Sequence, residues 1–364
     1  MEYPTESPKP KITRKTVFFP LIGLAAFFLY IYIFQVDIPT IIATAQRADP
    51  LLYAIAVALS LIEVFFFAVS WRVLANFLLI ELSVIKSYLF VWYGIFVDIL
   101  VPAESVSGEA LRVYLITKEQ GNNTCGRVVA SLVTHRLLGM AMNVAVLIIG
   151  MTVLFTETQI APLIFNLILF LAVGITVTLF LMLLFSFKEQ WSLRVIDWVI
   201  RLGKLISRGK WHWQLTKIKE DACRIAKSFH DSMKEFKRSP KALASSLFYL
   251  SITWVISLSI PYLVFMSLRF PVSWSVILIT SAIVLAVKSV PIGVPFEVGL
   301  PEITMTTIYT SLLGVQYAGI CAAATILTRL ITLWFRFFIG FLAQQWLELK
   351  PVSPPANNKP VEKA

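Results

Sequence analysis

The chain has 364 residues, of which 58% are hydrophobic and 15% charged, and its mean hydropathy is +0.78. Because a single soluble core cannot bury this much apolar surface, the composition excludes a soluble domain and predicts an all-α polytopic membrane protein. The formal net charge of +11 indicates basic cytoplasmic loops, so no nucleic-acid partner is expected.

Taken from the N-terminus, the chain begins with a basic cytoplasmic tail over residues 1–16 and an apolar run over 17–36. This run is too long for a signal peptide and lacks a cleavage site, so it predicts an uncleaved first span. Further apolar stretches cover residues 51–71, 84–101, 127–155, 160–187, 241–268, 272–290, 303–313 and 316–347. Residues 348–364 are rich in Pro, Asn and Lys, which predicts a short disordered tail.

The charge distribution sets the expected topology. Residues 188–240 carry an excess of Lys and Arg, which places this segment in the cytoplasm together with the N-terminus and the C-terminus. An even number of crossings must then precede residue 188, although five apolar segments do. We therefore expect residues 84–118 to be re-entrant from the cytoplasm and broken near Pro102, and residues 272–313 to re-enter from the outside.

Two membrane repeats of opposite orientation follow from this topology, at residues 17–155 and 160–347. Together they predict about six to eight transmembrane helices and two re-entrant broken segments in an inverted repeat. A cytoplasmic amphipathic insert at 188–240 interrupts the second repeat. Within it, residues 191–213 have apolar and basic positions at helical spacing, which predicts an interfacial helix on an anionic leaflet. The alternative topology has eight full spans and pairs the halves differently.

A pattern of charged residues is written twice within this apolar sequence. Val101-Pro102-x-Glu104-x4-Glu109 is followed by Arg136, and Val294-Pro295-x-Glu297-x4-Glu302 is followed by Arg329. Matching residues are 193 positions apart (302 − 109 and 329 − 136). An ionisable group at the bilayer centre costs roughly 2.5–3.5 kcal/mol on insertion scales and is usually kept for function. The repeated charges therefore predict the core of a transporter.

The candidate substrate-binding residues are the charges of this pattern and one neighbour, namely Glu109, Arg112, Arg136, Glu302 and Arg329. Buried arginines and carboxylates must pair with each other or line a wet cavity. The planar guanidinium suits a phosphate, which favours substrate contact, although a purely structural set of ion pairs is the alternative.

A second group of ionisable residues at membrane depth ranks below these. Its members are Glu104, Glu297, His135, Glu63, Asp98 and Lys288. His135 is a candidate for coupling transport to protons, and a satisfied core histidine is the alternative. A helix restarting at Gly108 after Pro102 is expected to offer free backbone amides to an anion, whereas prolines that only kink helices are the other interpretation.

Cysteine and histidine give no metal site. Cys125, Cys223 and Cys321 are widely scattered and fit neither a disulfide framework nor a CxxC motif. None of the three histidines stands at ligand spacing from a cysteine or another histidine. We therefore expect no metal and no cofactor.

Several motifs together resemble a known family. Gly108-Glu109-x-x-Arg112, then Arg136, then Pro295-x-x-x-Gly299-x-x-Glu302 and Leu327-x-Arg329 are similar to motifs of the flippase-like membrane domain of lysylphosphatidylglycerol synthases, which also occurs as stand-alone proteins. The resemblance covers residues 85–345. It implies movement of a lipid across the bilayer, or a role in glycolipid or polyprenol-phosphate pathways.

Two departures from the family pattern affect what can be carried over. Pro295-Phe296-Glu297 stands where the family usually has Pro-Gly-Gly, and His135 stands where a Glu commonly precedes the Arg. No aminoacyltransferase domain follows before Ala364, so lysyl transfer by this chain alone is not expected.

The leading interpretation is a flippase that translocates an anionic lipid or a lipid-linked headgroup, either polyprenol-phosphate or phospholipid, by rocking two inverted halves around a central site. One alternative is a membrane-embedded enzyme that acts on a lipid phosphate, with Glu109 or Glu302 as general base. The other is a non-catalytic membrane partner of a glycosyltransferase or another lipid-modifying enzyme.

Overall fold

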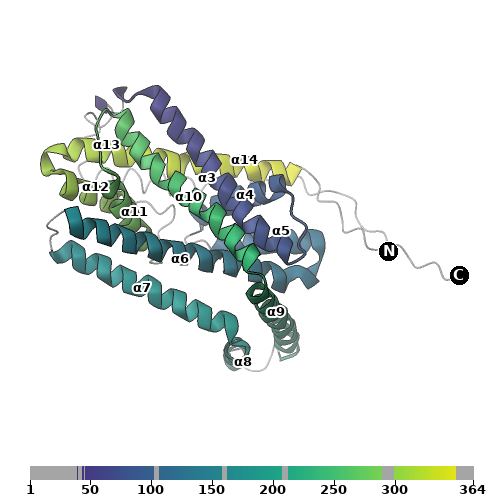
Figure 1. Ribbon diagram of the computed structural model, residues 1–364. Helices are drawn as coiled ribbons and strands as arrows, with labels where there is room; N and C mark the ends of the chain where they lie inside the picture. The colour runs from purple at the N-terminus through teal and green to yellow at the C-terminus, as the bar shows by residue number, and fades with distance from the viewer. Residues whose placement is uncertain are drawn as a thin grey trace.

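The computed structural model describes residues 39, 43, 44, 46–101, 106–157, 162–206, 212–288 and 299–349, and the regular structure in these ranges is helical (Figure 1). The expected first span at 17–36, the basic tail, Glu104 and Glu297 lie outside the described residues, as do residues 350–364. Residues 348 and 349, which were expected to begin the disordered tail, still belong to the last helix.

The described helices fall into two series with an insert between them. The first series is α3 (Pro50–Phe77), α4 (Val84–Leu100), α5 (Val106–Gln120), the 3-10 turn η1 (Asn122–Thr124) and α6 (Cys125–Glu157). The insert is α7 (Pro162–Phe187), α8 (Glu189–Ile206) and α9 (His212–Arg238). The second series is α10 (Pro240–Ser267), α11 (Trp274–Lys288), α12 (Leu300–Leu313), the 3-10 turn η3 (Val315–Tyr317), α13 (Ala318–Arg329), the π-helix η4 (Leu330–Phe335) and α14 (Arg336–Leu349).

Four of the expected spans are confirmed as helices long and apolar enough to cross a bilayer. They are Pro50–Phe77, Asn122–Val153, Pro240–Ser267 and Val315–Leu349. A fifth candidate is a pair of helices, Ala172–Phe187 and Glu189–Leu202, which meet at 93°. α4 and α11 contain only 17 and 15 residues, which is short for a bilayer about 30 Å thick. The chain is therefore an all-helical membrane protein with four or five candidate spans in its described part.

The two helical series share their turns as well as their order. Leu79 and Arg269, which follow α3 and α10, have positive φ angles of 59° and 56°, a conformation uncommon for residues other than glycine. Gly121 and Gly314, which precede η1 and η3, have φ angles of 91° and 110°. These pairs are 190 and 193 positions apart (269 − 79 and 314 − 121). The second half therefore repeats the local structure of the first at nearly the spacing of the charged pattern.

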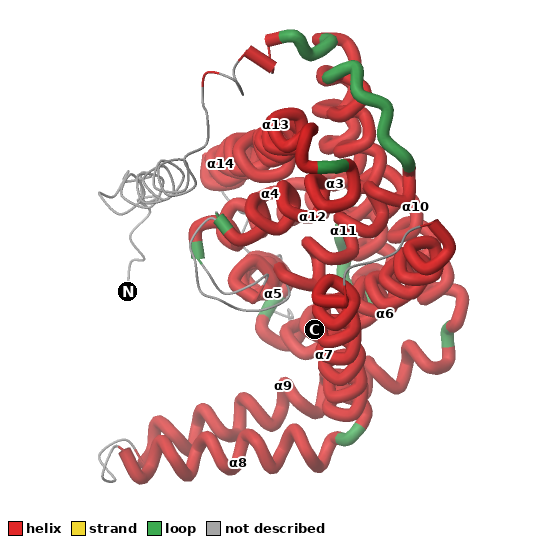
Figure 2. Tube along the Cα trace, turned by 90° about the vertical axis from the view of Figure 1, so that its left-hand side faces the viewer, coloured by secondary structure: helices red, strands yellow, loops and turns green. Residues whose placement is uncertain are grey.

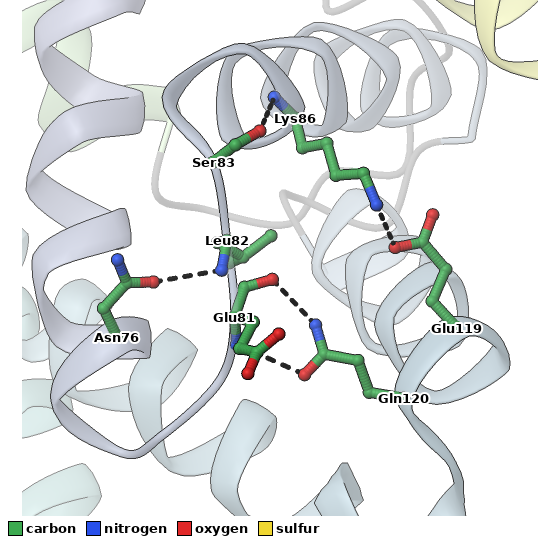
Figure 3. Close-up of polar contacts among 7 residues, drawn as sticks. All are labelled: Asn76, Glu81, Leu82, Ser83, Lys86, Glu119 and Gln120. Atoms are coloured by element: carbon green, nitrogen blue, oxygen red, sulfur yellow. Dashed lines mark hydrogen bonds and ion pairs between the residues drawn. The ribbon is translucent and has the colours of Figure 1, made fainter. Parts of the chain in front are cut away.

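α4 and α5 form a hairpin whose two ends lie together (Figure 3). The side-chain amide of Gln120, at the end of α5, donates to the Glu81 carbonyl (2.9 Å) and accepts from the Glu81 amide (3.3 Å), just before α4. Lys86 in the first turn of α4 forms a 2.9 Å ion pair with Glu119. Residues 84–120 therefore begin and end on the same side of the protein, as a re-entrant segment requires.

α11 and α12 make the corresponding hairpin. Phe270, in the turn before α11, packs edge-to-face against Tyr317 of η3, with ring centroids 5.0 Å apart. Tyr262 of α10 stacks on Trp274, the first residue of α11, with ring centroids 4.3 Å apart. The start of α11 and the end of α12 are thus also neighbours.

α3 and α10 occupy equivalent places in the two series, and they pack side by side in opposite directions (Figure 1). The Asp49 amide at the start of α3 donates to the carbonyl of Ser267 at the end of α10 (2.7 Å). Twenty-one positions further along α3, the Ser70 hydroxyl lies 2.9 Å from the Ser246 carbonyl near the start of α10. The first long helices of the two series are therefore antiparallel.

Each hairpin packs against the last long helix of the other half. A Cβ added to Gly340 of α14 would lie 2.7 Å from the Trp92 carbonyl of α4. A Cβ added to Gly150 of α6 would lie 2.8 Å from Leu278 of α11. The backbone carbonyl beside Gly340 leaves no room for a side chain there, so glycine allows α14 to approach α4 closely. At Gly150 the nearest atom is the end of the flexible Leu278 side chain, which could move aside.

Candidate functional site

The first charged pair connects the hairpin α4–α5 to α6. Glu109 lies in the first turn of α5 and its Oε2 is 3.4 Å from Nη1 of Arg136 in α6. The side chains of Glu109 and Arg136 are 22% and 29% exposed. This pair is therefore accessible to water or to a ligand.

Asp98 closes the start of α5. Its Oδ1 accepts hydrogen bonds from the Ser107 hydroxyl and from the Gly108 amide, both at 2.7 Å. The expectation that the helix restart offers a free amide at Gly108 is therefore wrong, because a carboxylate of the protein already accepts from that amide. A Cβ at Gly108 would lie 2.4 Å from Asp98 Oδ2 and 2.5 Å from the Gly94 carbonyl, so only glycine fits here.

Arg112 is buried one turn further along α5. Its Nε donates to the Gly108 carbonyl at 3.3 Å, and its guanidinium carbon lies 5.1 Å from the centre of the Trp71 ring. Nη1 is fully buried and has no hydrogen-bond partner among the described residues. A buried guanidinium with a free donor is suited to an anion that enters the site.

His135 is buried beside Arg136 in the sequence but makes a different contact. Its ring packs edge-to-face on Phe67 with centroids 4.6 Å apart. Its Nε2, like Arg112 Nη1, has no hydrogen-bond partner in the described part of the chain. The proton-coupling role of His135 stays a prediction.

The second charged pair, Glu302–Arg329, occupies the position in the second half that Glu109–Arg136 occupies in the first, but it is buried. Nε of Arg329, at the end of α13, lies 2.5 Å from Oε1 of Glu302 in the first turn of α12. The other carboxylate oxygen, Oε2, accepts from the Gly299 amide at 2.7 Å and so caps the helix. The Glu302 and Arg329 side chains are only 3% and 6% exposed. Met305 stands 193 positions after Arg112 (305 − 112), so the second half lacks that cation.

Glu63 has a partner that the sequence pattern did not indicate. Its carboxylate forms an ion pair with Arg336 at the start of α14, and Arg336 Nε also contacts the Ser60 hydroxyl at 3.2 Å. This pair joins α3 of the first half to α14 of the second. It is therefore placed to hold the two halves together, and Arg336 is the charged residue that sequence reasoning missed.

The two halves also meet near the charged pairs. Ile99 at the end of α4 lies in one apolar cluster with Ile303 of α12 and Leu333 of η4. Ile303 directly follows Glu302, and Ile99 directly follows Asp98. Each carboxylate pairs with the arginine of its own half. That Glu109 and Glu302 lie close to each other stays a prediction.

The remaining candidates are placed only in part. α11 ends at Lys288, whose side chain lies outside the description, as do Glu104 and Glu297. Within the described ranges, no group of three or more His, Cys, Asp or Glu side chains could hold a metal ion.

Comparison with known proteins agrees with the resemblance seen in the motifs. The sequence model of the lysylphosphatidylglycerol synthase TM region matches residues 20–340. A UPF0104 membrane protein of Pyrococcus horikoshii is 24% identical over 320 residues, covering 88% of this chain and 94% of that protein. A UPF0104 membrane protein of Methanothermobacter thermautotrophicus is 25% identical over 309 residues, covering 82% of this chain and 86% of that protein.

Proposed function

We propose that this chain, which belongs to the lysylphosphatidylglycerol synthase transmembrane-region family, moves an anionic lipid or lipid-linked headgroup across the membrane that it spans several times. The observation that carries the proposal is the Glu–Arg pair that occurs once in each half. Each pair joins the restarted helix of a hairpin to the long helix that follows it. Ion pairs at membrane depth are expensive to maintain, and they commonly mark the path of a substrate.

An inverted-topology repeat gives these pairs a common role. The antiparallel packing of the equivalent helices α3 and α10 supports a two-fold axis in the membrane plane. Under that symmetry, the hairpins α4–α5 and α11–α12 re-enter from opposite sides, and both chain ends lie in the cytoplasm. Transporters with inverted repeats form their substrate site from discontinuous helices near the bilayer midplane. The charged pairs stand at the discontinuities.

The chemistry of the site favours an anionic oxygen-rich group, such as the phosphate of a phospholipid or a polyprenol phosphate. Arg136 is partly accessible, and Arg112 holds a buried Nη1 without a hydrogen-bond partner among the described residues. A guanidinium binds phosphate through two parallel N–H···O bonds. Asp98 and Glu302 already accept hydrogen bonds from the helix-start amides of Gly108 and Gly299, so we assign the anion to the guanidinium groups of Arg112 and Arg136.

The unequal exposure of the two pairs fits alternating access. The first pair is 22–29% exposed and the second only 3–6%. In an inverted repeat, exchanging the conformations of the two halves would seal Glu109–Arg136 and open Glu302–Arg329. In the present conformation the Glu109–Arg136 pair is then accessible and the Glu302–Arg329 pair is closed off.

The test is translocation of a labelled phospholipid or polyprenol phosphate in proteoliposomes. Arg136→Lys and Arg329→Lys keep the charge but lose the bidentate fork, so both variants should fold and transport more slowly. Glu119→Gln removes the Lys86–Glu119 ion pair where the two ends of the same hairpin meet, away from Glu109 and Arg136, and is the matched control, which should transport like the wild type. Full transport by stable Lys variants at both positions would contradict phosphate recognition.

The same samples distinguish the competing functions. Conversion of the labelled lipid to a new product by the purified protein would favour the membrane-embedded enzyme. Absence of both transport and turnover, together with stoichiometric co-purification of a glycosyltransferase, would favour the non-catalytic partner.

A further inference from the structure

The insert α7–α9 contains a surface that the translocation site does not use. α7 lies alongside α6 (Figure 1), and α8 leaves its end at 93°. In Figure 2, α8 and α9 extend together as an arm away from the other helices. If α7 crosses the bilayer with the other long helices, this arm lies parallel to the membrane plane.

The direction of the arm is fixed by contacts at its base. His230 of α9 is buried, and its Nδ1 and Nε2 lie 3.1 Å from the Ser186 carbonyl and 3.1 Å from the Ser192 hydroxyl, on either side of the bend. A Cβ at Gly126 of α6 would lie 2.5 Å from Ser228 of α9, so α9 is pressed against α6. The right angle is therefore part of the packed structure.

α8 presents a stripe of exposed apolar side chains. The stripe consists of large exposed side chains at helical spacing, namely Trp191, Val195, Trp198, Val199 and Leu202. Trp198 is 62% exposed. Exposed apolar stripes of this kind mark contact with a membrane or a protein, and Trp concentrates at membrane–water interfaces.

Charge and position identify the membrane as the partner. Arg194 and Arg201 are exposed beside the stripe. At the bend, Lys188 Nζ lies 5.4 Å from the Trp191 ring and Lys237 Nζ lies 4.3 Å from the Phe187 ring. Aromatic rings with neighbouring cations, at the point where a candidate span ends, match the headgroup region of an anionic leaflet.

α9 contacts the polar side of α8. Lys219 of α9 forms a 2.7 Å ion pair with Asp197 of α8, and the hydrogen bond from Lys219 lowers the pKa of Asp197. This ion pair joins the polar sides of α8 and α9. The apolar stripe is left facing outward.

We infer that the α8–α9 arm is a membrane-docking element, in which the stripe of α8 lies at the headgroup–acyl boundary of an anionic leaflet and Arg194 and Arg201 contact lipid phosphates. An amphipathic helix in this position buries its apolar face about 5–10 Å deep. The inference does not depend on lipid translocation, because it concerns a surface outside the repeated charged pairs.

The experiment uses the full chain in nanodiscs with an environment-sensitive fluorophore on Val195→Cys. Cys125 and Cys223 are first replaced by serine, whereas Cys321 is buried and stays. The matched control is Glu220→Cys, an exposed position of α9 on the opposite side of that helix from Ile218. Quenching by iodide should be several-fold weaker at Val195 than at Glu220, and quenching by lipid-borne nitroxides several-fold stronger.

Lipid composition tests the charge contribution. Nitroxide quenching at Val195 should increase when phosphatidylglycerol replaces phosphatidylcholine, and Arg194→Gln with Arg201→Gln should abolish that increase. Equal iodide quenching at Val195 and Glu220 would overturn membrane docking and would leave the stripe as a surface for a protein. Equal depth in both lipids would overturn the assignment to an anionic leaflet.

Discussion

Removal of the two repeated arginines should destabilise the protein to different extents. Arg329→Ala leaves Glu302, whose side chain is 3% exposed, without the guanidinium 2.5 Å away. Removing one partner of a buried ion pair costs about 3–5 kcal/mol. Arg136→Ala leaves Glu109, which is 22% exposed and was 3.4 Å from its partner. Water can solvate that carboxylate, so the expected loss is about 1–2 kcal/mol.

The measurement is the free energy of unfolding in mixed detergent–dodecyl sulfate micelles, where reversible unfolding can be compared between variants. A control removes both charges of the sealed pair, as Glu302→Gln with Arg329→Met. This double variant should be more stable than Arg329→Ala alone, because no uncompensated charge stays buried. Equal losses for the two alanine variants, or a larger loss for Arg136→Ala, would refute the reasoning from exposure.

Two further predictions concern packing within the fold. Gly108→Ala should lower the free energy of unfolding by about 2–4 kcal/mol, because the new methyl group overlaps the Gly94 carbonyl and displaces the Asp98 cap. The control is Gly139→Ala, which has open space around it. In the same unfolding assay it should be neutral or stabilising by up to about 1 kcal/mol. A Gly108→Ala protein as stable as the wild type would contradict the close approach of α4 and α5. Glu63→Ala should lower the unfolding free energy by about 2 kcal/mol, since it leaves the guanidinium of Arg336 partly buried and hydrogen-bonded to the Ser60 hydroxyl but without its carboxylate partner. No loss would show that the pair does not hold α3 to α14.

The long apolar helices could be predicted from the sequence because each apolar stretch is long enough to cross the bilayer. α3, α6, α10 and the helix that ends at Leu349 all fall on expected stretches. The re-entry of residues 84–118 and 272–313, inferred from charge parity, stays a prediction. The 27-residue spacing from Glu to Arg correctly indicated partners in both halves. These features depend on composition and spacing, which the sequence shows directly.

Other features depend on three-dimensional arrangement. Asp98 was recognised as a charge at membrane depth, but its role as the cap of α5 requires the α4–α5 angle. Arg336 escaped notice because it has no counterpart in the first half. The π-helix Leu330–Phe335 lies directly before Arg336 and changes the direction in which the following side chains project. The residue types in that segment do not predict a π-helix.

The arrangement of the two hairpins tests the inverted repeat at the centre of the proposed function most directly. Single cysteines at Ser83 and Gln120 mark the two ends of α4–α5, and cysteines at Ser273 and Gln316 mark the two ends of α11–α12. Labelling with a membrane-impermeant maleimide in oriented vesicles should reach Ser83 and Gln120 from the cytoplasmic side, and Ser273 and Gln316 only from the outside. Labelling of Gln120 from the outside alone, or of all four positions from one side, would contradict the inverted repeat.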